Sequence, residues 1–310
     1  MLRRGRELNL VCGRASAECQ PFGHRVVEVI DLHTHSSRSD GTDTPSDLLA
    51  QAAETGLTTL AITDHDTTAG WDEAAEAAQR HGVALVRGAE LSTRHHGGSV
   101  HLLAYLFDPT DEPLAEEMRR MREDRVPRLR RIVERMEDDG FAVTWEDVLA
   151  QVPEGPATLG RPHLADALVA NGSATDRNEV FNRWLHNGSR YYEPHYAVET
   201  AEAVRLVLEA GGVPVVAHPF ATKRQRSLGA EDVALLTDAG LVGIEVDHRD
   251  HDDEGKAFAR QLAVRHDLVP TGSSDFHGDG KTNRLGEHVT TPESFARIEA
   301  AASGITPVLR

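Results

Sequence analysis

The amino-acid sequence predicts an α/β protein built on a TIM-like β/α barrel, interrupted by one insertion that contains only helices. Short apolar runs rich in β-branched residues alternate with helix-like stretches over residues 26–108 and again over 196–310. Such alternation favours a largely parallel sheet. Side chains that bind metals also follow directly after most of these runs. Because the loops at the carboxyl ends of barrel strands meet at one rim, this second pattern favours a barrel that carries a metal site.

In the first half of the predicted barrel, helix and turn signals separate the apolar runs. Thr44-Pro45-Ser46-Asp47 combines a capping residue, a proline at the first helical position and an acid in the first turn, and Gly56 ends that helix. The turn His95-His96-Gly97-Gly98 is expected to join two strands as a hairpin. We therefore predict strands at 26–32, 57–63, 83–91 and 100–107, and helices at 45–54 and 69–81.

The alternation stops at Asp108, and residues 109–195 contain only helix-like patterns. Pro127 is expected to kink or break the first of these helices, because proline cannot donate the backbone hydrogen bond that a helix interior needs. We expect this insertion to cap the substrate. Its helices are predicted at 112–139, 145–150, 161–170 and 178–186; beyond it we predict helices at 200–210, 230–239 and 252–266 and strands at 213–217, 241–246 and 268–271.

The composition is that of an ordinary soluble globular protein, with 39% hydrophobic and 27% charged residues in a chain of 310. The formal net charge of −17 argues against binding of long nucleic acid or of an anionic membrane by bulk attraction. No apolar run approaches the ~20 residues of a membrane span. An anionic substrate would need local positive charge, which bound metal ions supply. No obligatory protein partner is evident.

Both cysteines, Cys12 and Cys19, lie within the first 25 residues, far from the predicted metal ligands. No disulfide framework and no cysteine–zinc site is therefore implied. The same segment is rich in arginine but lacks the continuous apolar stretch of a signal peptide. We expect residues 1–25 to be a disordered extension on a cytoplasmic protein; the alternative is a mis-assigned start codon, because the first strand begins only at Val26.

Nine potential metal ligands lie at the ends of the apolar runs. His33 and His35 are two residues apart, and on an extended chain this spacing puts both imidazoles on the same face. Asp31, with the same parity, is placed to orient one of them. Any one such residue would more often be a capping acid or a core histidine, but six strand ends that share the pattern favour a metal centre. The nine are His33, His35, Asp40, His65, Glu90, His101, His218, Asp275 and His277.

The mixture of ligands indicates the ion and the reaction. Histidines with a few carboxylates and no thiolate suit manganese, iron or zinc better than magnesium or calcium. Manganese is the expected ion, at up to three per chain, with one carboxylate shared between two ions. Closely spaced ions activate water and neutralise the charge on a transferring phosphoryl group, so the pattern favours hydrolysis of a phosphate ester.

These motifs resemble those of the PHP (polymerase and histidinol phosphatase) superfamily of metal-dependent phosphoesterases. The resemblance covers residues 28–290, and it implies a distorted seven-stranded β/α barrel of the PHP type. The motifs match in order: Asp31-Leu32-His33-Thr34-His35-Ser36, Thr63-Asp64-His65-Asp66, Gly88-Ala89-Glu90, Ala217-His218-Pro219 and Ser274-Asp275-Phe276-His277.

The resemblance also implies how the ligands divide among the ions. Glu90 would bridge two of them, and a hydroxide held between ions would attack the phosphate ester. Glu90, Asp40 and His218 are therefore the expected catalytic residues. The implied sets are His33, His35, Glu90 and Asp275 for the first ion, Glu90, His101 and His218 for the second, and Asp40, His65 and His277 for the third.

Asp40 stands where many PHP proteins have histidine. Together with the helical insertion and the motif Leu159-Gly160-Arg161-Pro162-His163-Leu164-Ala165, it resembles one branch of the superfamily. That branch contains 3′,5′-nucleotide bisphosphate phosphatases, nucleoside-monophosphate phosphatases and the 5′-to-3′ exoribonuclease of short RNAs. The resemblance thus implies small nucleotides or 5′-phosphorylated short RNA as substrates.

Arginines of the insertion are the expected phosphate anchors, because guanidinium groups bind phosphate in bidentate fashion. By resemblance Arg161 lies beside the substrate. Arg125, Arg128 and Arg131 repeat every three residues on another helix, where a solvated basic face is the alternative. Asp40 and His277 complete the expected substrate contacts. Of the other histidines, His163 is expected to be structural, His248 to line the pocket, and His95, His96, His251 and His288 to lie on the surface.

Two alternatives to a nucleotide phosphatase or exonuclease stay open. Histidinol-phosphate phosphatase belongs to the same superfamily, but Asp40 and the arginines of the insertion count against it. A non-catalytic PHP module is the second alternative. Such modules of DNA polymerases are parts of much longer chains and often lose ligands, whereas this chain keeps all nine.

Overall fold

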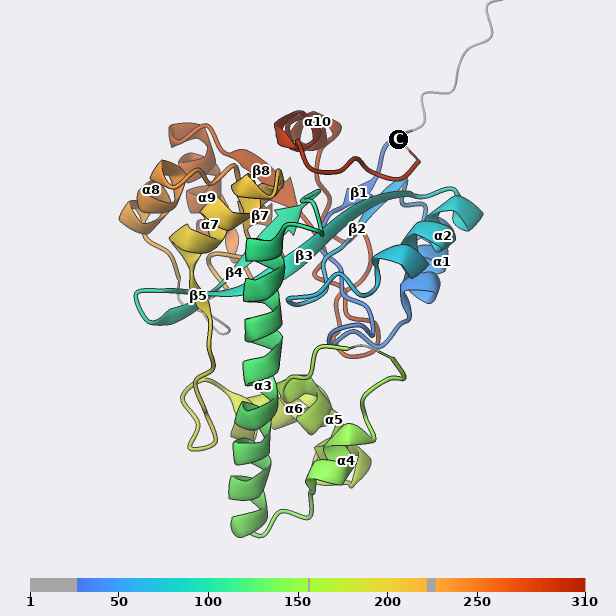
Figure 1. The fold of residues 1–310 in the computed structure, drawn as a ribbon, viewed down its shortest axis with the longest axis vertical. Coiled ribbons are helices and arrows are strands. Elements are labelled where there is room, and N and C mark those ends of the chain that lie inside the picture. The colour runs from blue at the N-terminus through green and yellow to red at the C-terminus, as the bar shows by residue number, and fades with distance from the viewer. Residues whose placement is uncertain (1–26, 156, 222–226, 310) are drawn as a thin grey trace, which may run out of the picture.

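The computed structural model describes residues 27–155, 157–221 and 227–309, and the predicted disordered extension at 1–25 lies outside them. Seven strands form a nearly closed barrel, as predicted, and their order is β1-β2-β3-β4-β6-β7-β8. The short β5 pairs with β3 beside it (Figure 1). The strands are β1 Ile30–Asp31, β2 Thr59–Ile62, β3 Ala84–His95, β4 Gly98–Tyr105, β5 Val198–Glu199, β6 Val213–Val216, β7 Gly243–Asp247 and β8 Val269–Gly272.

The barrel strands run parallel except for β4, which is antiparallel to both β3 and β6. The β3–β4 hairpin turns where the sequence predicts it, with His95 opposite Gly98. Isolated bridges pair Thr34 with Phe276 and Ile30 with Thr290, so the chain around β1 meets the chain that follows β8. The barrel is distorted by the reversed strand but presents the carboxyl ends of its parallel strands at one rim.

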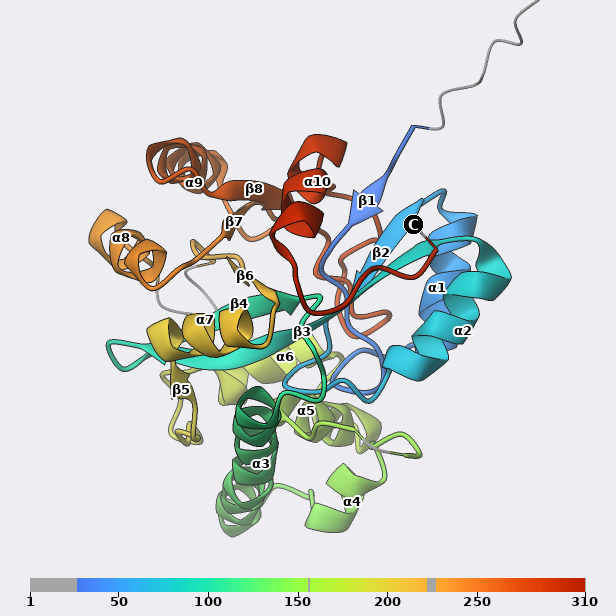
Figure 2. The same cartoon turned by 45° about the horizontal axis from the view of Figure 1, so that its top comes forward.

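Helices of the described residues cover the outside of the barrel (Figure 2). Their buried faces supply much of the core; Leu48 and Leu49 of α1 and Phe295 of α10 are fully buried. Thr44 caps α1 by accepting from Asp47 N at 3.1 Å, as the sequence predicts, whereas α10 has no predicted counterpart. These helices are α1 Pro45–Glu54, α2 Trp71–His81, α7 Thr200–Glu209, α8 Ala230–Asp238, α9 Asp253–Arg265 and α10 Pro292–Ala301.

The remaining helices lie together below the barrel in the view of Figure 1, around an apolar cluster of their own. The long α3 leads into this region, and its buried residues Ile132, Val133 and Met136 pack there with Leu164 and Leu168 of α5. The helices are α3 Glu112–Asp138, α4 Trp145–Leu149, α5 Arg161–Ala170 and α6 Arg177–Val180, which continues into the π-helix η1 Phe181–Leu185.

Pro127 does not break α3, so of the predicted kink or break the break is wrong. Residues on both sides of the proline are anchored by packing: Leu114 and Met121 belong to the barrel core, whereas Leu129 and Ile132 belong to the core of the helical region. Burial of both halves offsets the backbone hydrogen bond that proline cannot make. As a result, α3 is a continuous link between the barrel and the helical region.

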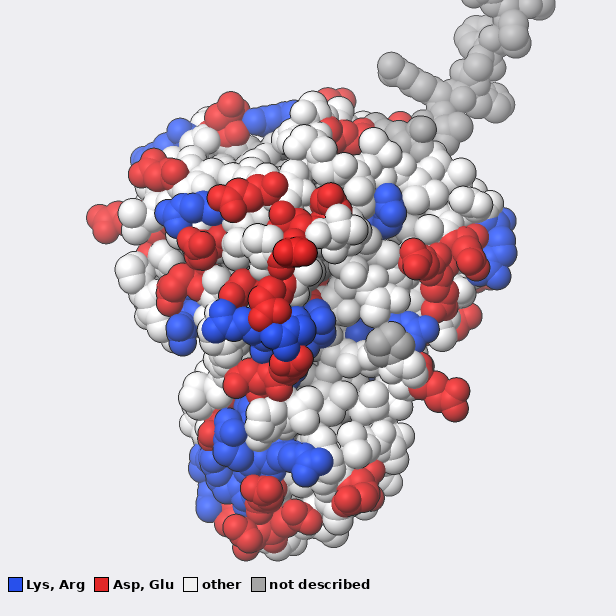
Figure 3. All heavy atoms as spheres, viewed as in Figure 1, with Lys and Arg blue, Asp and Glu red and all other residues white. Residues whose placement is uncertain are grey.

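The face shown in Figure 3 carries acidic and basic side chains that intermix along α3 rather than separate into fields of one sign. Ion pairs such as Arg119–Glu116 and Arg120–Glu117 are part of this pattern. Within the described residues, no helix is both long enough and apolar enough to cross a membrane.

Candidate metal centre

The nine predicted ligands all lie around the barrel rim, and every one of them lies close to another ligand of the set. His33 and His35 follow β1, His65 follows β2, Glu90 and His101 lie within β3 and β4, and the others follow β6 and β8 or lie in the loop before α1. Among these nine, the groups close enough to share an ion are His33, His35, Glu90 and Asp275; His35, Asp40, His65 and His277; and His65, Glu90 and His101.

The first group has the spacing of ligands around one ion. His33 Nε2 lies 3.2 Å from His35 Nε2 and 3.2 Å from Glu90 Oε2, and both nitrogens lie 3.5 Å from Asp275 Oδ1. Two ligands bound at 2.0–2.2 Å to one ion are roughly 3.0–3.6 Å apart, which matches these separations. Two imidazole nitrogens that face each other across such a gap gain from a shared cation. All four side chains are almost completely buried.

Glu90 connects this group to the neighbouring histidines through its two oxygens. Oε2 lies 3.0 Å from His35 Nε2 and 3.3 Å from His65 Nδ1. Oε1 lies 2.8 Å from His101 Nδ1 and 3.0 Å from His218 Nε2. The two oxygens therefore face different sets of imidazoles, as a carboxylate that bridges two ions requires.

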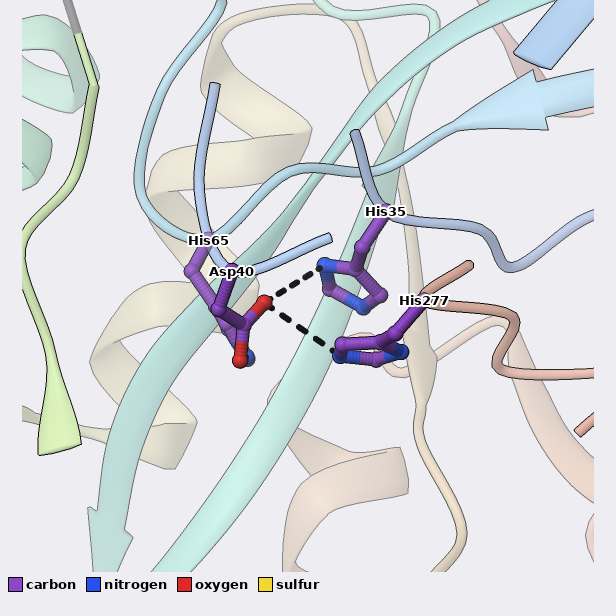
Figure 4. Close-up of side chains that lie close together, drawn as sticks. All are labelled: His35, Asp40, His65 and His277. Atoms are coloured by element: carbon purple, nitrogen blue, oxygen red, sulfur yellow. Dashed lines mark ion pairs between the residues drawn. The ribbon is translucent and has the colours of Figure 1, made fainter. Parts of the chain in front are cut away.

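A further group gathers around Asp40 at the mouth of the site (Figure 4). Asp40 Oδ1 lies 3.3 Å from His277 Nε2 and 3.7 Å from His35 Nδ1, and Oδ2 lies 3.8 Å from His65 Nε2. Within the described part of the chain, the buried atoms His65 Nδ1 and His277 Nε2 make no hydrogen bond. Buried polar atoms normally have a partner, so these two nitrogens fit the role of metal ligands.

The pKa values of Glu90, His218 and His277 favour the protonation states that metal binding needs, whereas, against the effect of burial, Glu90 and Glu245 raise the pKa of His33 well above its usual value. Burial raises the pKa of Glu90, but the imidazoles of His101 and His33 lower it, and the net pKa lies well below the usual value. Burial lowers the pKa of both His218 and His277 to about 4. The carboxylate is thus ionised and these two imidazoles are neutral near pH 7, as divalent cations require of their ligands.

Glu245 is a residue of this site that the sequence analysis missed. It is fully buried in β7, its Oε1 lies 3.3 Å from His33 Nδ1, and its Oε2 accepts from His218 N at 2.8 Å. Burial raises the pKa of Glu245, but His33 lowers it to about 2. Glu245, rather than Asp31, orients the His33 ring. The only available signal was one acidic residue inside an otherwise apolar run.

Asp31 has a different role from the predicted one. Its carboxylate accepts from the backbone amides of Ser274 at 3.0 Å and Gly286 at 2.9 Å, as well as from His33 N at 3.4 Å. Burial raises its pKa to about 6. Asp31 therefore fixes the backbone of the loops that carry the ligands and does not orient an imidazole.

Two histidines predicted on the surface are buried instead. His95 Nε2 lies 2.9 Å from Asp232 Oδ1, and this contact joins the β3–β4 hairpin to α8. His251 is held between two backbone groups, since its Nδ1 contacts Val246 O at 2.9 Å and its Nε2 accepts from Phe220 N at 3.1 Å. His248 is also buried, with Nε2 3.5 Å from Asp275 Oδ2. His163 is buried and accepts from Gly160 N, as a structural residue would.

A cavity of about 470 Å³ lies between the rim and the helical region. Asp40, Glu90 and His218 line it from the barrel side. His277 is only 1% exposed and does not line the cavity, so its contact with substrate stays a prediction. Arg125, Arg128 and Arg161 line the cavity from the helices.

The three arginines differ in how they are neutralised. Arg125 is paired with Asp66, with 2.7 Å between Nη2 and Oδ2, and also donates to Ser92 Oγ. Arg128 donates to Glu193 O, and Arg161 donates to Leu185 O at 2.7 Å. Within the described residues, neither Arg128 nor Arg161 has a carboxylate partner. Both are therefore placed to bind an anion that enters the cavity.

Burial and mutual repulsion act on these cations. Burial lowers the pKa of Arg161 to about 10, and burial together with Arg161 and Arg125 lowers that of Arg128 to about 9. His195, a cavity residue that the sequence analysis missed, has its pKa lowered to about 2 by burial and by the same arginines. Lys281 also lines the cavity and donates to Asp275 Oδ2 at 3.0 Å. A bound phosphate would relieve the repulsion among these groups.

Comparison with known proteins identifies the family. Residues 31–149 match the model of the PHP domain. A 3′,5′-nucleoside bisphosphate phosphatase from Chromobacterium violaceum is 35% identical over 256 residues, which cover 82% of this chain and 89% of that protein. The chain belongs to the PHP family.

Other relatives have related but distinct activities. A phosphoribosyl 1,2-cyclic phosphate 1,2-diphosphodiesterase from Eggerthella lenta is 36% identical, covering 84% of this chain and 98% of that protein. The 5′-3′ exoribonuclease Rnm from Salmonella typhimurium is 32% identical, covering 85% and 90%. The crystal structure of a candidate metal-dependent phosphoesterase from Bifidobacterium adolescentis has a TM-score of 0.87 and 43% identity, covering 89% of this chain and 97% of that one. The predictions of an enzyme, and of a phosphoesterase, are confirmed.

Proposed function

We propose that this PHP enzyme removes a phosphate from small nucleotides, with 3′,5′-nucleotide bisphosphates as the preferred class. The observation that carries the proposal is the pair Arg128 and Arg161, which face the ligand cluster across one cavity without carboxylate partners within the described residues. A substrate with two phosphates would place one phosphate next to the proposed metal ions at the rim and pair the other with the two guanidinium groups. The relative from Chromobacterium violaceum acts on this class of substrate by name.

The nine rim residues are the proposed ligands of up to three divalent ions. The separations of 3.0–3.5 Å within the first group and the shared position of Glu90 support this assignment. Manganese is the proposed ion because imidazoles dominate the set, and zinc or iron would suit the same donors. Bound ions would supply an activated water and would neutralise charge on the phosphoryl oxygens.

The residues of the chain position the substrate around that chemistry. Arg128 and Arg161 would hold the phosphate that does not react, and this anchor fixes the ester bond at the rim. Glu90 would set the distance between the groups of ligands on its two sides. Asp40 faces the cavity beside His65. His218, together with His101, lies next to Glu90 Oε1. The helices over the cavity limit the access of bulk water, which strengthens the charge interactions inside.

A panel of phosphate esters tests the proposal. The protein is stripped of metal, reloaded with manganese and assayed with adenosine 3′,5′-bisphosphate, adenosine monophosphate, a 5′-phosphorylated RNA trimer and histidinol phosphate. We expect kcat/KM for the bisphosphate to exceed that for the monophosphate by about tenfold or more, since a second charge-assisted contact is made. Preference for histidinol phosphate, or no phosphate release from any nucleotide, would refute it.

The 5′-phosphorylated RNA trimer represents the second candidate function. The Salmonella typhimurium relative is a 5′-3′ exoribonuclease by name, and the same two arginines would hold the phosphodiester that follows the first nucleotide. A higher kcat/KM for the trimer than for the bisphosphate would favour this candidate. Product analysis by mass spectrometry would then show single nucleotides released from the 5′ end.

A further inference from the structure

One face of the helical region presents uncharged side chains to the cavity. Asn178 of α6 and Phe181 and Asn182 of η1 line it next to the arginines, whereas Leu185 at the end of η1 is buried in the core of the helical region. Their spacing of three and four residues places them along one side of a helix. The predicted metal ligands do not lie on this face, and among the described residues Arg161 contacts it only at Leu185 O and near the Phe181 ring. The two asparagines are left to contact another part of the substrate.

The π-helix holds this face against the phosphate anchor. Single π-turns inserted in α-helices occur frequently at functional sites. Here the turn ends at Leu185, whose carbonyl oxygen accepts from Arg161 Nη1 at 2.7 Å. The Arg161 guanidinium also lies 5.6 Å from the centre of the Phe181 ring. The aromatic ring and the phosphate anchor are therefore neighbours.

The two asparagine amides of this face are available to a ligand. Asn178 and Asn182 are exposed, and their side chains make no hydrogen bond within the described residues. On the side of the turn away from the cavity, by contrast, the side chains bond to each other, since Arg183 donates to Glu179 Oε1 at 2.7 Å. An amide offers one acceptor and two donors, which matches the polar edge of a nucleobase but adds no charge that would attract a further phosphate.

We propose that Asn178, Phe181 and Asn182 form a nucleobase subsite: the Phe181 ring packs against the base, and the two amides bond to its polar edge. This inference deepens the proposed function, on which it rests, because it makes the base and not only the two phosphates a determinant of recognition. Base–aromatic stacking tolerates every base, so the subsite would distinguish nucleotides from base-free sugar phosphates more strongly than it distinguishes one base from another.

The test compares two substrates that differ only in the base. Adenosine 3′,5′-bisphosphate is assayed beside its base-free analogue, a tetrahydrofuran ring that carries the same two phosphates. We expect kcat/KM to fall roughly five- to a hundred-fold when the base is absent, mostly through KM, as loss of one stacked base predicts. Phe181→Leu and Asn182→Ala should each lower kcat/KM for the nucleotide while the base-free ester changes by less than about twofold.

Arg183→Ala is the matched control, because it alters the same turn on the side away from the cavity. It should leave both substrates unchanged. Equal kcat/KM for the nucleotide and the base-free ester, or equal losses on both in Phe181→Leu and Asn182→Ala, would overturn the subsite while the phosphatase activity stands. Absence of turnover with either bisphosphate would instead overturn the proposed function itself.

Discussion

Arg161→Ala should weaken the enzyme selectively against substrates with a second phosphate. Arg161 lines the cavity opposite the ligand cluster, and within the described residues its hydrogen bonds are donated by one nitrogen, Nη1, to Leu185 O and Asn187 Oδ1. Its Nε and Nη2 remain to bind an anion. A small aryl phosphate carries only the reacting group, so it does not use this anchor.

The size of the effect follows from the contact that is lost. A hydrogen bond to a charged group contributes about 1.5–3 kcal/mol, which corresponds to a loss of roughly ten- to a hundred-fold in kcat/KM for the bisphosphate. The aryl phosphate should lose less than about twofold, because it makes no such contact. Both values are measured by phosphate release with manganese-loaded protein, and metal content is measured on the same samples.

Arg131→Ala is the matched control. Arg131 lies on α3 like Arg128 but does not line the cavity, and its exposed guanidinium pairs with Glu193 at 2.8 Å. The Arg131→Ala variant loses one positive charge from the same region as Arg161→Ala, so an effect of net charge alone would appear in both variants. Equal losses on both substrates in Arg161→Ala, or loss of bound metal, would show that Arg161 supports the fold instead.

Three further predictions concern the rim. Glu90→Gln should lower kcat by several orders of magnitude, because the two oxygens of Glu90 face both sets of imidazoles. Circular dichroism should show that the variant keeps its fold. Near-normal turnover with saturating manganese would contradict the prediction. Chelation should abolish activity, and manganese should restore it better than magnesium in a phosphate-release titration; full recovery with magnesium alone would contradict the histidine-rich assignment. Glu245→Gln should weaken metal affinity about 10- to 100-fold, because Glu245 orients the His33 ring. High manganese concentrations should restore the activity. Unchanged metal affinity would show that Glu245 is a purely structural residue.

The barrel and its ligands were predictable because their signals are local. A strand that ends in a metal ligand carries both its apolar run and its polar residue within a few consecutive positions, as in the segment that leads to His65. The hairpin at His95-His96-Gly97-Gly98 and the cap at Thr44 are equally local. The hairpin, the cap and the position of His65 after a strand were confirmed, whereas its role as a metal ligand stays a prediction. β1 spans only Ile30–Asp31, far less than the run predicted at 26–32.

The features that could not be predicted from the sequence depend on contacts between residues far apart in the chain. Glu245 lies 212 positions from His33, so nothing in its neighbourhood indicates that the strand turns it toward the site. His95 is buried by Asp232, 137 positions away. Pro127 is tolerated because two separate cores hold the halves of α3, and neither core is visible in a window around the proline.

The structure divides the work of the enzyme between two regions that one helix joins. The nine predicted ligands lie around the rim, and four of them, His33, His35, Glu90 and Asp275, form one buried group. The helices place Arg128, Arg161 and one face of η1 on the opposite side of the cavity. In a chain with a net charge of −17, this arrangement places two arginines without carboxylate partners among the described residues at the cavity. Changes in the helical face would then alter which phosphate ester is accepted without altering the ligands. The relatives fit this division, since they share the family but differ by name between a bisphosphate, a cyclic phosphate and RNA.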